Sequence, residues 1–413
     1  MIAEIIIIGD EILIGQVVDT NSAWIAEQLN LIGINVFQIT SISDNKDHIY
    51  AALNAAIKRS KIVLITGGLG PTNDDITKQT LCDYFGTELV FNEQVYANIV
   101  DLLLDRGFSM NELNRKQAEV PENCVVLENK IGTAPGMWFK KNSTIFISMP
   151  GVPFEMKEMM KTSVLPYLKE HFNAGVICHK TVLTQGIAES ALAEKIADWE
   201  AALPDEVHLA YLPSPGIVRL RLTGNGACEK QLKDEMEKNI QTLNEIIPDH
   251  IFGYNDDVLE GVVGNLLAKN KSTLSIAESC TGGNIAHMIT SVAGSSAYFK
   301  GSMVAYSNEL KIKELSIDSQ IIQQFGAVSK EVVELMAKNI CSKFATDYSI
   351  ATSGIAGPDG GSHEKPVGTV WIAVANNNIV ISQKFNFGEH RQRTIQKASL
   401  AALNMLRKLL LNL

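Results

Sequence analysis

The chain opens on a strand-forming run, Glu4-Ile5-Ile6-Ile7-Ile8, that decides how its first part folds. Four consecutive isoleucines leave no polar face, which is typical of a parallel strand buried on both sides. Helical and strand-forming runs alternate after it, over residues 21–31, 34–39, 47–59 and 62–66. This βαβ order predicts a parallel sheet covered by helices on both faces.

The same part of the chain continues with a strand expected over residues 145–148 and a closing helix expected over 154–170. Asn21 lies where the N-cap of the first long helix belongs, because Asn side chains accept hydrogen bonds from the first helical N–H groups. We therefore expect one α/β domain over residues 1–170.

Two further parts follow. Residues 171–254 read as strand, helix, two strands and helix, and the Leu212-Pro213-Ser214-Pro215-Gly216 turn between the two strands predicts that they are antiparallel. This is a small α+β module. From residue 255 to 413 the alternation of strand and helix returns, and a long amphipathic helix over 391–411 ends it. The fold class is therefore α/β, with two α/β domains joined by the module.

Composition excludes several classes of protein. The 413 residues are 46% hydrophobic and carry a formal net charge of −10, so neither duplex DNA nor an anionic membrane is an expected partner. The six cysteines show no Cys-x-x-Cys pair, which favours free thiols in a reducing compartment. No apolar stretch reaches the roughly 20 residues of a membrane-spanning helix. We expect a soluble, cytoplasmic protein.

The run Ala277-Glu278-Ser279-Cys280-Thr281-Gly282-Gly283 carries the clearest chemistry. It follows an expected strand and opens an expected helix, and such a loop directs backbone N–H groups at an anion. Ser279 would lie at its mouth, either as a nucleophile or as a phosphate ligand. The alternative is an ordinary capped helix. Small or polar residues at other strand ends favour a ligand site; they occur at 306–308, 326–329 and 352–358.

From about Val258 to Leu413 the chain resembles the C-terminal domain of the CinA family, which also occurs alone as bacterial nicotinamide-mononucleotide deamidase. The resemblance implies an α/β sandwich that hydrolyses the amide of nicotinamide mononucleotide and releases ammonia, with no cofactor. It makes Ser279 the nucleophile, assisted by Lys311, and adds Tyr306 to the catalytic residues.

The chemistry is consistent with that resemblance. A serine hydroxyl needs a base, and Lys311 can be that base only as a neutral amine, which partial burial would favour. The N–H groups near Thr281, Gly282 and Gly283 are the expected oxyanion donors. Cys280 is the competing nucleophile, although an isolated buried cysteine is usually inert.

The substrate phosphate needs a cation, and Arg391 and Arg393 are the candidates. Where the family often shows Gly-Asp-Arg, this chain has Gly388-Glu389-His390-Arg391, so the choice between the two arginines stays open. Solvated charge at a helix start is the alternative for both. With Arg391, Gly357 completes the expected substrate-binding residues of this domain.

A second glycine-rich loop, residues 66–77, also follows a strand and precedes a helix. Such a loop can hold a phosphate or pyrophosphate, and the adjacent Asp74 and Asp75 suit a hydrated divalent cation; an ordinary turn with an Asp cap is the alternative. The residues expected to bind substrate here are Gly67, Gly68, Gly70 and Thr72.

The loop resembles the molybdopterin-binding fold of molybdopterin adenylyltransferases, as do Gly9-Asp10-Glu11 and the run 149–155. In CinA proteins this domain is associated with metal-dependent hydrolysis of the pyrophosphate of ADP-ribose, with cobalt or magnesium as the metal. The resemblance implies that Asp75 is catalytic. The expected metal-site residues are Asp10, Glu11, Asp74, Asp75 and Glu155.

Two other functions remain open: a pterin-nucleotide binder in the first domain, or a competence accessory protein that acts only through contacts. The expected partners are small nucleotides, nicotinamide mononucleotide and ADP-ribose, with no nucleic acid and no membrane. The module at 171–254 resembles the KH-like linker of full-length CinA proteins but shows no Gly-x-x-Gly loop, which favours a spacer or dimerisation role. The expectation of a homodimer rests on the resemblance alone.

Overall fold

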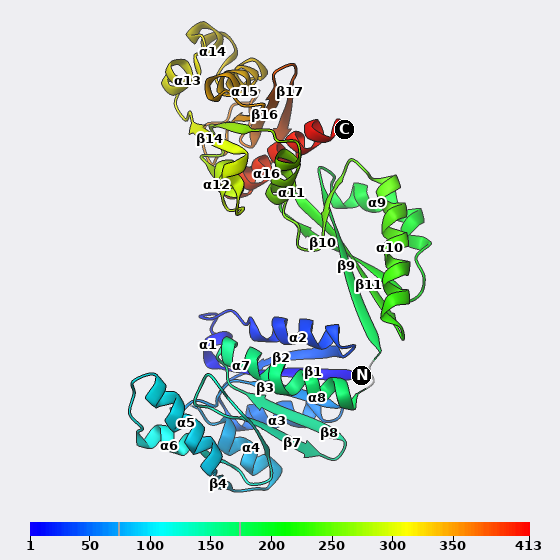
Figure 1. The fold of residues 1–413 in the computed structure, drawn as a ribbon, viewed down its shortest axis with the longest axis vertical. Helices are drawn as coiled ribbons and strands as arrows, with labels where there is room; N and C mark the ends of the chain where they lie inside the picture. The colour runs from blue at the N-terminus through cyan, green and yellow to red at the C-terminus, as the bar shows by residue number, and fades with distance from the viewer. Residues whose placement is uncertain (73–74, 173–174) are drawn as a thin grey trace. The chain divides into compact units, whose positions relative to one another are not determined.

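The computed structural model describes residues 1–72, 75–172 and 175–413. The chain divides into two compact units, residues 1–178 with 225–232, and residues 179–224 with 233–413. Each is a mixed α/β structure, and the small α+β module that resembles a KH-like linker, called the KH-like domain below, joins the N- and C-terminal domains along the chain. Figure 1 shows helices on both faces of the sheet in each α/β domain.

The sheet of the first unit has six strands in the order β2-β1-β3-β8-β7-β6. Four of them are parallel: β2 (Asn35–Ile42), β1 (Ile2–Ile8), β3 (Ile62–Thr66) and β8 (Thr144–Met149). The parallel strands confirm the βαβ prediction. The sequence analysis missed the antiparallel extension, which consists of β7 (Gly136–Lys141) and β6 (Val125–Leu127).

The isoleucine run is buried on both faces. Ile5 and Ile7 face α2 (Asn21–Leu31) and the helical stretch α7 (Pro153–Met159), η1 (Met160–Val164) and α8 (Leu165–His171), whereas Ile6 and Ile8 face α3 (Lys46–Ala56) and α4 (Thr77–Phe85). This explains why the strand has no polar face: a parallel sheet between two helical layers buries both sides of each pleat. The rest of this unit comprises α1 (Asp10–Leu13), β4 (Leu89–Phe91), α5 (Glu93–Asp105), α6 (Glu112–Gln117) and β5 (Glu119–Pro121).

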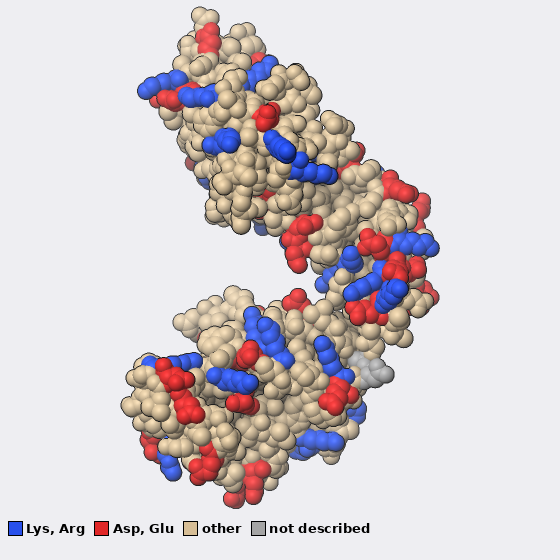
Figure 2. Space-filling model, in the orientation of Figure 1, with Lys and Arg blue, Asp and Glu red and all other residues tan. Residues whose placement is uncertain are grey.

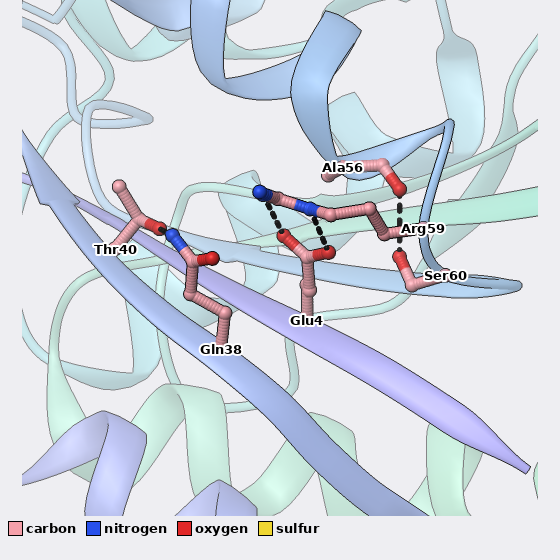
Figure 3. A network of polar contacts seen from close by, with 6 residues as sticks. All are labelled: Glu4, Gln38, Thr40, Ala56, Arg59 and Ser60. Carbon is pink, nitrogen blue, oxygen red and sulfur yellow. Dashed lines mark hydrogen bonds and ion pairs between the residues drawn. The ribbon is translucent and has the colours of Figure 1, made fainter.

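One acid interrupts the apolar run. Glu4 is 1% exposed, and Arg59 pairs with it through two hydrogen bonds, Nε to Oε1 at 2.9 Å and Nη2 to Oε2 at 2.8 Å (Figure 3). A buried carboxylate is tolerated only when it is paired, and the two-point geometry satisfies both of its oxygens. The ion pair therefore permits an acid in the central strand.

The N-cap prediction for Asn21 was wrong. Asn21 is the first residue of α2, and its side chain makes no capping bond; Asp19 instead accepts from the Ser22 N–H at 3.0 Å. The Asn21 amide nitrogen donates to Gly151 O at 2.7 Å and to Thr66 Oγ1 at 3.2 Å. Because those partners lie at the end of β3 and in the loop after β8, the tertiary structure outcompetes the local cap.

The KH-like domain has a four-stranded sheet, β10-β11-β9-β12. Its elements are β9 (Val176–Gln185), α9 (Glu189–Ala201), β10 (Val207–Ser214), β11 (Ile217–Gly226), α10 (Glu229–Ile246) and β12 (Ile251–Tyr254). The predicted antiparallel pair is confirmed, since Ser214 pairs with Ile217 across the turn and Val207 with Gly224 at the far end.

The C-terminal sheet has the order β14-β13-β15-β16-β17. Strand β13 (Leu274–Glu278) is parallel to β14 (Phe299–Val304) and β15 (Tyr348–Gly354), and the antiparallel β16 (Thr369–Asn376) and β17 (Val380–Asn386) complete it. Helices α11 (Leu259–Lys269), α12 (Asn284–Thr290) and α16 (Arg391–Leu411) cover one face. Helices α13 (Asn308–Leu315), α14 (Ser319–Phe325) and α15 (Lys330–Phe344) cover the other, and a single turn, η2 (Ser295–Ala297), precedes β14.

Candidate active sites

Ser279 lies where three parallel strands end together. It follows β13 directly, its N–H donates to Thr352 O of β15 at 3.0 Å, and its side chain is 8% exposed. The Thr281 hydroxyl is 2.7 Å from the Thr352 hydroxyl, which fixes the loop against the neighbouring strand. The carboxyl ends of parallel strands are where open α/β sheets bind ligands, so the expected position of this serine agrees with the observed one.

Lys311 reaches Ser279 from the helix that follows β14. Its Nζ lies 3.1 Å from Ser279 Oγ and donates to Ala305 O at 2.8 Å and to Tyr306 O at 3.3 Å. Lys311 is 2% exposed, and burial lowers its pKa below the ordinary 10.5. Among the partners that the described residues provide for this amine there is no carboxylate, so the neutral form is favoured by desolvation alone.

The same contacts mark where strand β14 stops, at Val304. The carbonyl groups of Ala305 and Tyr306 accept from the lysine rather than from a neighbouring strand. The helix that carries the lysine is fixed at its start, because Ser307 Oγ accepts from the Leu310 N–H at 3.2 Å.

Cys280 lies next to the serine but is less suited to attack. Its side chain is 6% exposed and belongs to the hydrophobic core, and burial raises its pKa to about 12. The thiolate is the nucleophilic form of cysteine, and it is scarce at neutral pH when the pKa is this high. The structure therefore favours the serine as the nucleophile of this loop.

Glu278 has a role that the sequence analysis missed. It is fully buried, and its carboxylate accepts from three N–H groups: Gly283 at 3.0 Å, Ile285 at 3.1 Å and Ala286 at 2.9 Å. A carboxylate at the start of α12 satisfies N–H groups that have no partner within the helix and interacts favourably with the helix dipole. The signal was an acid directly before the glycine-rich turn.

This arrangement narrows the choice of oxyanion donors. The Gly282 N–H donates to Ser279 O at 3.1 Å, and the Gly283 N–H is bound by the Glu278 carboxylate. Within the described part of the chain, the N–H groups of Cys280 and Thr281 have no acceptor. Of the three donors that we expected, only Thr281 can therefore act without giving up a bond, and Cys280 joins it.

We expect Glu278→Ala to lower the free energy of unfolding by about 3 kcal/mol, because three buried N–H groups lose a charged acceptor. Glu278→Gln keeps one acceptor oxygen and should lose about 1 kcal/mol. Urea unfolding followed by far-UV circular dichroism measures both, with exposed Glu309→Ala as the matched control. Equal stability of Glu278→Ala and the control would contradict this role.

Arg391 and Tyr306 meet at the edge of the same site. Arg391 donates from Nη1 to Gly357 O at 2.7 Å and from Nη2 to the Tyr306 hydroxyl at 3.1 Å. Arg393 lines a separate cavity together with Phe385 and Phe387. The structure thus brings together Ser279, Lys311, Tyr306, Gly357 and Arg391 around one sheet edge, and it separates Arg393 from them.

The first unit holds a pocket of about 510 Å³ at the carboxyl ends of β1, β2, β3 and β8. The segment that follows each of these strands lines it; these segments carry Glu11 in α1, Asp44 and Asp75 in loops, and Glu155 in α7. The glycine-rich loop passes close to β1, because a Cβ on Gly67, whose φ is +113°, would overlap the carbonyl oxygen of Ile8. Gly68 and Gly70 also line the pocket.

Asp75 is held within its own loop. Its Oδ2 accepts from the Thr72 N–H at 3.0 Å and from the Thr72 hydroxyl at 2.5 Å, and a Cβ on Gly70 would lie 2.5 Å from the same oxygen. Thr72, which we expected to bind substrate, orients this carboxylate and is absent from the residues that line the pocket. Asp74 lies outside the described residues.

Asp44 is a pocket carboxylate that the sequence analysis did not single out. It follows β2, lines the pocket and accepts from the Asp10 N–H at 3.2 Å. Burial raises its pKa, and the charges of Asp10, Glu11 and Asp75 raise it further, so three other acids lie within electrostatic reach of Asp44. Its position two residues beyond a parallel strand was the signal that could have found it.

Glu155 is tied to a different loop. Its Oε2 accepts from Asn129 Nδ2 at 2.7 Å, and burial raises its pKa. Asn129 in turn accepts from the N–H groups of Ile131 and Gly132. This carboxylate therefore holds the 129–133 loop at the pocket wall.

The donor set fits a hydrated cation better than a fully protein-ligated one. Within residues 1–72, 75–172 and 175–413, no three His, Cys, Asp or Glu side chains converge closely enough to hold a metal ion. Magnesium-type cations, however, are commonly held by one or two carboxylates, water and substrate phosphate. The mutual repulsion that raises the pKa of Asp44 is what a cation among these acids would relieve.

The chain is an α/β protein with a buried serine–lysine pair at the carboxyl ends of one set of parallel strands and an acidic pocket at those of another. Three family models match it: "CinA C-terminal domain" over residues 256–410, "Probable molybdopterin binding domain" over 4–170, and "Damage-inducible protein CinA KH domain" over 179–253.

Relatives match along nearly the whole chain. A CinA-like protein of Cytophaga hutchinsonii is 50% identical over 406 residues, which cover 98% of this chain and 97% of that protein. A CinA-like protein of Chloroherpeton thalassium is 43% identical, covering 99% of both. The crystal structure of the competence/damage inducible protein CihA from Agrobacterium tumefaciens is 35% identical, covers 37% of this chain and 93% of that chain, and has a TM-score of 0.36. The chain belongs to the CinA family.

Across the described residues, every helix is too short or too polar to cross a membrane.

Proposed function

We propose that the C-terminal domain is an amidohydrolase that converts nicotinamide mononucleotide to nicotinate mononucleotide and ammonia. The observation that carries the proposal is the 3.1 Å contact between Lys311 Nζ and Ser279 Oγ, made by a buried lysine whose pKa is lowered. A neutral amine at hydrogen-bond distance from a serine hydroxyl can take the proton as the oxygen attacks a carbonyl carbon.

In the proposed reaction, Ser279 Oγ attacks the amide carbon while Lys311 takes the hydroxyl proton. The N–H groups of Cys280 and Thr281 hydrogen-bond the oxyanion, and the lysine returns the proton to the departing ammonia. Water then hydrolyses the acyl-enzyme by the same steps. Arg391, held by Gly357 O and the Tyr306 hydroxyl, supplies the cation for the substrate phosphate, which makes Tyr306 a residue that positions this arginine.

The test is ammonia release by the full chain from nicotinamide mononucleotide and from nicotinamide riboside, each with and without EDTA. We expect release from the mononucleotide, an unchanged rate with chelator, and a much higher KM for the riboside, which lacks the phosphate. If ammonia is released from neither amide, or if the chelator abolishes release, a metal-independent amidohydrolase is contradicted.

We further propose that the pocket of the first unit hydrolyses the pyrophosphate of ADP-ribose with a divalent cation, cobalt or magnesium. The support is the group of carboxylates around Asp75 at the ends of the parallel strands. One or two of Asp75, Asp44, Asp10 and Glu11 would hold the cation, with water and the substrate phosphate completing its coordination. A bound cation would neutralise phosphate charge and lower the pKa of attacking water.

We expect Asp75→Asn to reduce ADP-ribose hydrolysis at least about 10²-fold, because the variant loses a charge among the reacting groups while keeping the oxygen that Thr72 contacts. Release of AMP, followed by chromatography at saturating cobalt or magnesium, measures the effect. Exposed Asp101→Asn, which does not line the pocket, is the matched control. EDTA should abolish the activity of the wild type.

Equal rates for Asp75→Asn and the control, or full activity in EDTA, would contradict the pyrophosphatase and favour a pterin-nucleotide binder. The non-enzymatic alternative, a competence accessory protein, rests on the names of relatives, such as the putative competence-damage inducible protein of Caldicellulosiruptor saccharolyticus. On the face drawn in Figure 2, Lys and Arg side chains are interspersed with Asp and Glu, whereas DNA binding would favour a continuous basic groove. Salt-dependent DNA binding would support that alternative.

A further inference from the structure

A cavity in the second unit lies apart from the serine–lysine pair and has a different lining. It encloses about 620 Å³, within the 300–1,000 Å³ range of small-molecule sites. The KH-like domain contributes residues 185–189 and the β10–β11 turn, 213–218. The C-terminal domain contributes Phe385 and Phe387 near the end of β17, and Arg393, Lys397 and Ala401 of α16.

Buried contacts fix the two walls to each other. Asn404 of α16 donates to the Gln185 side chain, and Arg407 donates to Asn404 Oδ1 at 2.8 Å and to Asp249 O at 3.0 Å. Leu183 and Phe252 of the KH-like domain belong to the same buried cluster as α11 and α16. A cavity between walls held in this way is largely formed before a ligand arrives, which lowers the cost of binding.

One wall is aromatic. The rings of Phe385 and Phe387 have centroids 5.2 Å apart and are inclined by only 11°. They are two residues apart at the end of a strand, so both point to the same side of the sheet, and both are partly exposed. The two rings are stacked on each other, and a planar aromatic ring can extend such a stack.

The lining from α16 is cationic. Arg393 and Lys397 are four residues apart on α16 and therefore lie on one face of the helix. In the part of the chain that the structure describes, neither side chain makes an ion pair, although the protein as a whole has a net charge of −10. Glu189 is the one acid among the lining residues. Two cations that line a cavity and have no ion-pair partner favour an anionic ligand there.

We propose that this cavity binds a planar aromatic anion of the nucleotide class, with its ring against Phe385 and Phe387 and its phosphate near Arg393 and Lys397. The site is distinct from the one at Ser279. Arg391 and Arg393 share the first turn of α16, yet the first contacts Gly357 and Tyr306 and the second lines the cavity.

The test uses the full chain and AMP as the probe. Adenosine, which lacks the phosphate, and ribose 5-phosphate, which lacks the aromatic base, serve as comparison probes. Hydrogen–deuterium exchange locates binding, because AMP can also enter the other two sites. We expect AMP to protect residues 213–218 and 385–397, and adenosine and ribose 5-phosphate each to need at least about tenfold higher concentration for the same protection.

Variants test the cationic and the aromatic lining residues separately. Arg393→Met with Lys397→Met should weaken AMP protection of these segments at least about tenfold, and Phe387→Leu should weaken AMP but leave ribose 5-phosphate unchanged. Lys384→Met is the matched control, because Lys384 is an exposed cation of β17 that does not line the cavity. Circular dichroism checks that each variant folds. Protection confined to the other two sites, or equal protection in the double variant and the control, overturns the proposal.

Discussion

Ser279→Ala should abolish ammonia release from nicotinamide mononucleotide, with kcat reduced at least about 10⁴-fold, because the variant lacks the atom that forms the acyl-enzyme. The hydroxyl is nearly buried and has Lys311 Nζ as its hydrogen-bond partner at 3.1 Å, so its removal should alter the fold little. Initial rates with coupled detection of ammonia measure the loss, and rapid-quench mass spectrometry of the wild type should reveal a transient acyl group on Ser279.

The adjacent cysteine provides the control. Cys280→Ala should retain the wild-type kcat within about threefold, because a thiol whose pKa is raised to about 12 supplies almost no thiolate at neutral pH. The substitution should lower only the free energy of unfolding, since the Cys280 side chain packs in the core. If Cys280→Ala is inactive and Ser279→Ala is active, the cysteine is the nucleophile and the assignment reverses.

Lys311→Met should reduce kcat about 10²- to 10⁴-fold, the usual contribution of a general base. Methionine has a similar length but cannot take a proton. Lys311→Arg should be equally impaired, because a guanidinium stays protonated at any working pH. Lys313→Met is the matched control: it removes an exposed lysine from the same helix and should leave kcat unchanged.

The pH dependence gives a second measurement of this lysine. Burial lowers its pKa, so the neutral amine is populated at a lower pH than for an exposed lysine. The wild-type rate should rise with pH and level off, with its midpoint below 10.5. Folding stability should rise with pH over the same window, because between the folded pKa and 10.5 the unfolded chain binds more protons. Lys311→Met should lack this part of the stability profile.

A wild-type rate that is flat from acidic to alkaline pH, or a Lys311→Met variant with the activity of Lys313→Met, would contradict the lysine as base. The stability profile keeps these outcomes interpretable, since it reports on the pKa of the side chain whether or not the reaction occurs. If Lys311→Met loses the pH-dependent rise in folding stability but keeps its activity, the lysine is a buried structural residue and not the base.

Much of the fold could be predicted because it depends on local patterns. Four isoleucines in a row indicate a strand buried on both faces, and α16 begins and ends at the residues that periodicity predicted, 391–411. The antiparallel strands β6 and β7 were missed, because nothing in a short apolar run says which neighbour it will pair with.

The sequence by itself determined which residue types follow which strands, and hence that Ser279 and Asp75 lie at the carboxyl ends of parallel strands, where open α/β sheets usually bind ligands. Only the tertiary structure decided which side chains come together at each site. It brings Arg391, not Arg393, to Tyr306 beside the serine–lysine pair, adds Asp44 to the acidic pocket, and makes Asn21 a link between β3 and the loop after β8 rather than a helix cap. The physical reason is that burial and hydrogen-bond partners depend on segments far apart in the chain, and those contacts set the pKa of Lys311 and select among local alternatives.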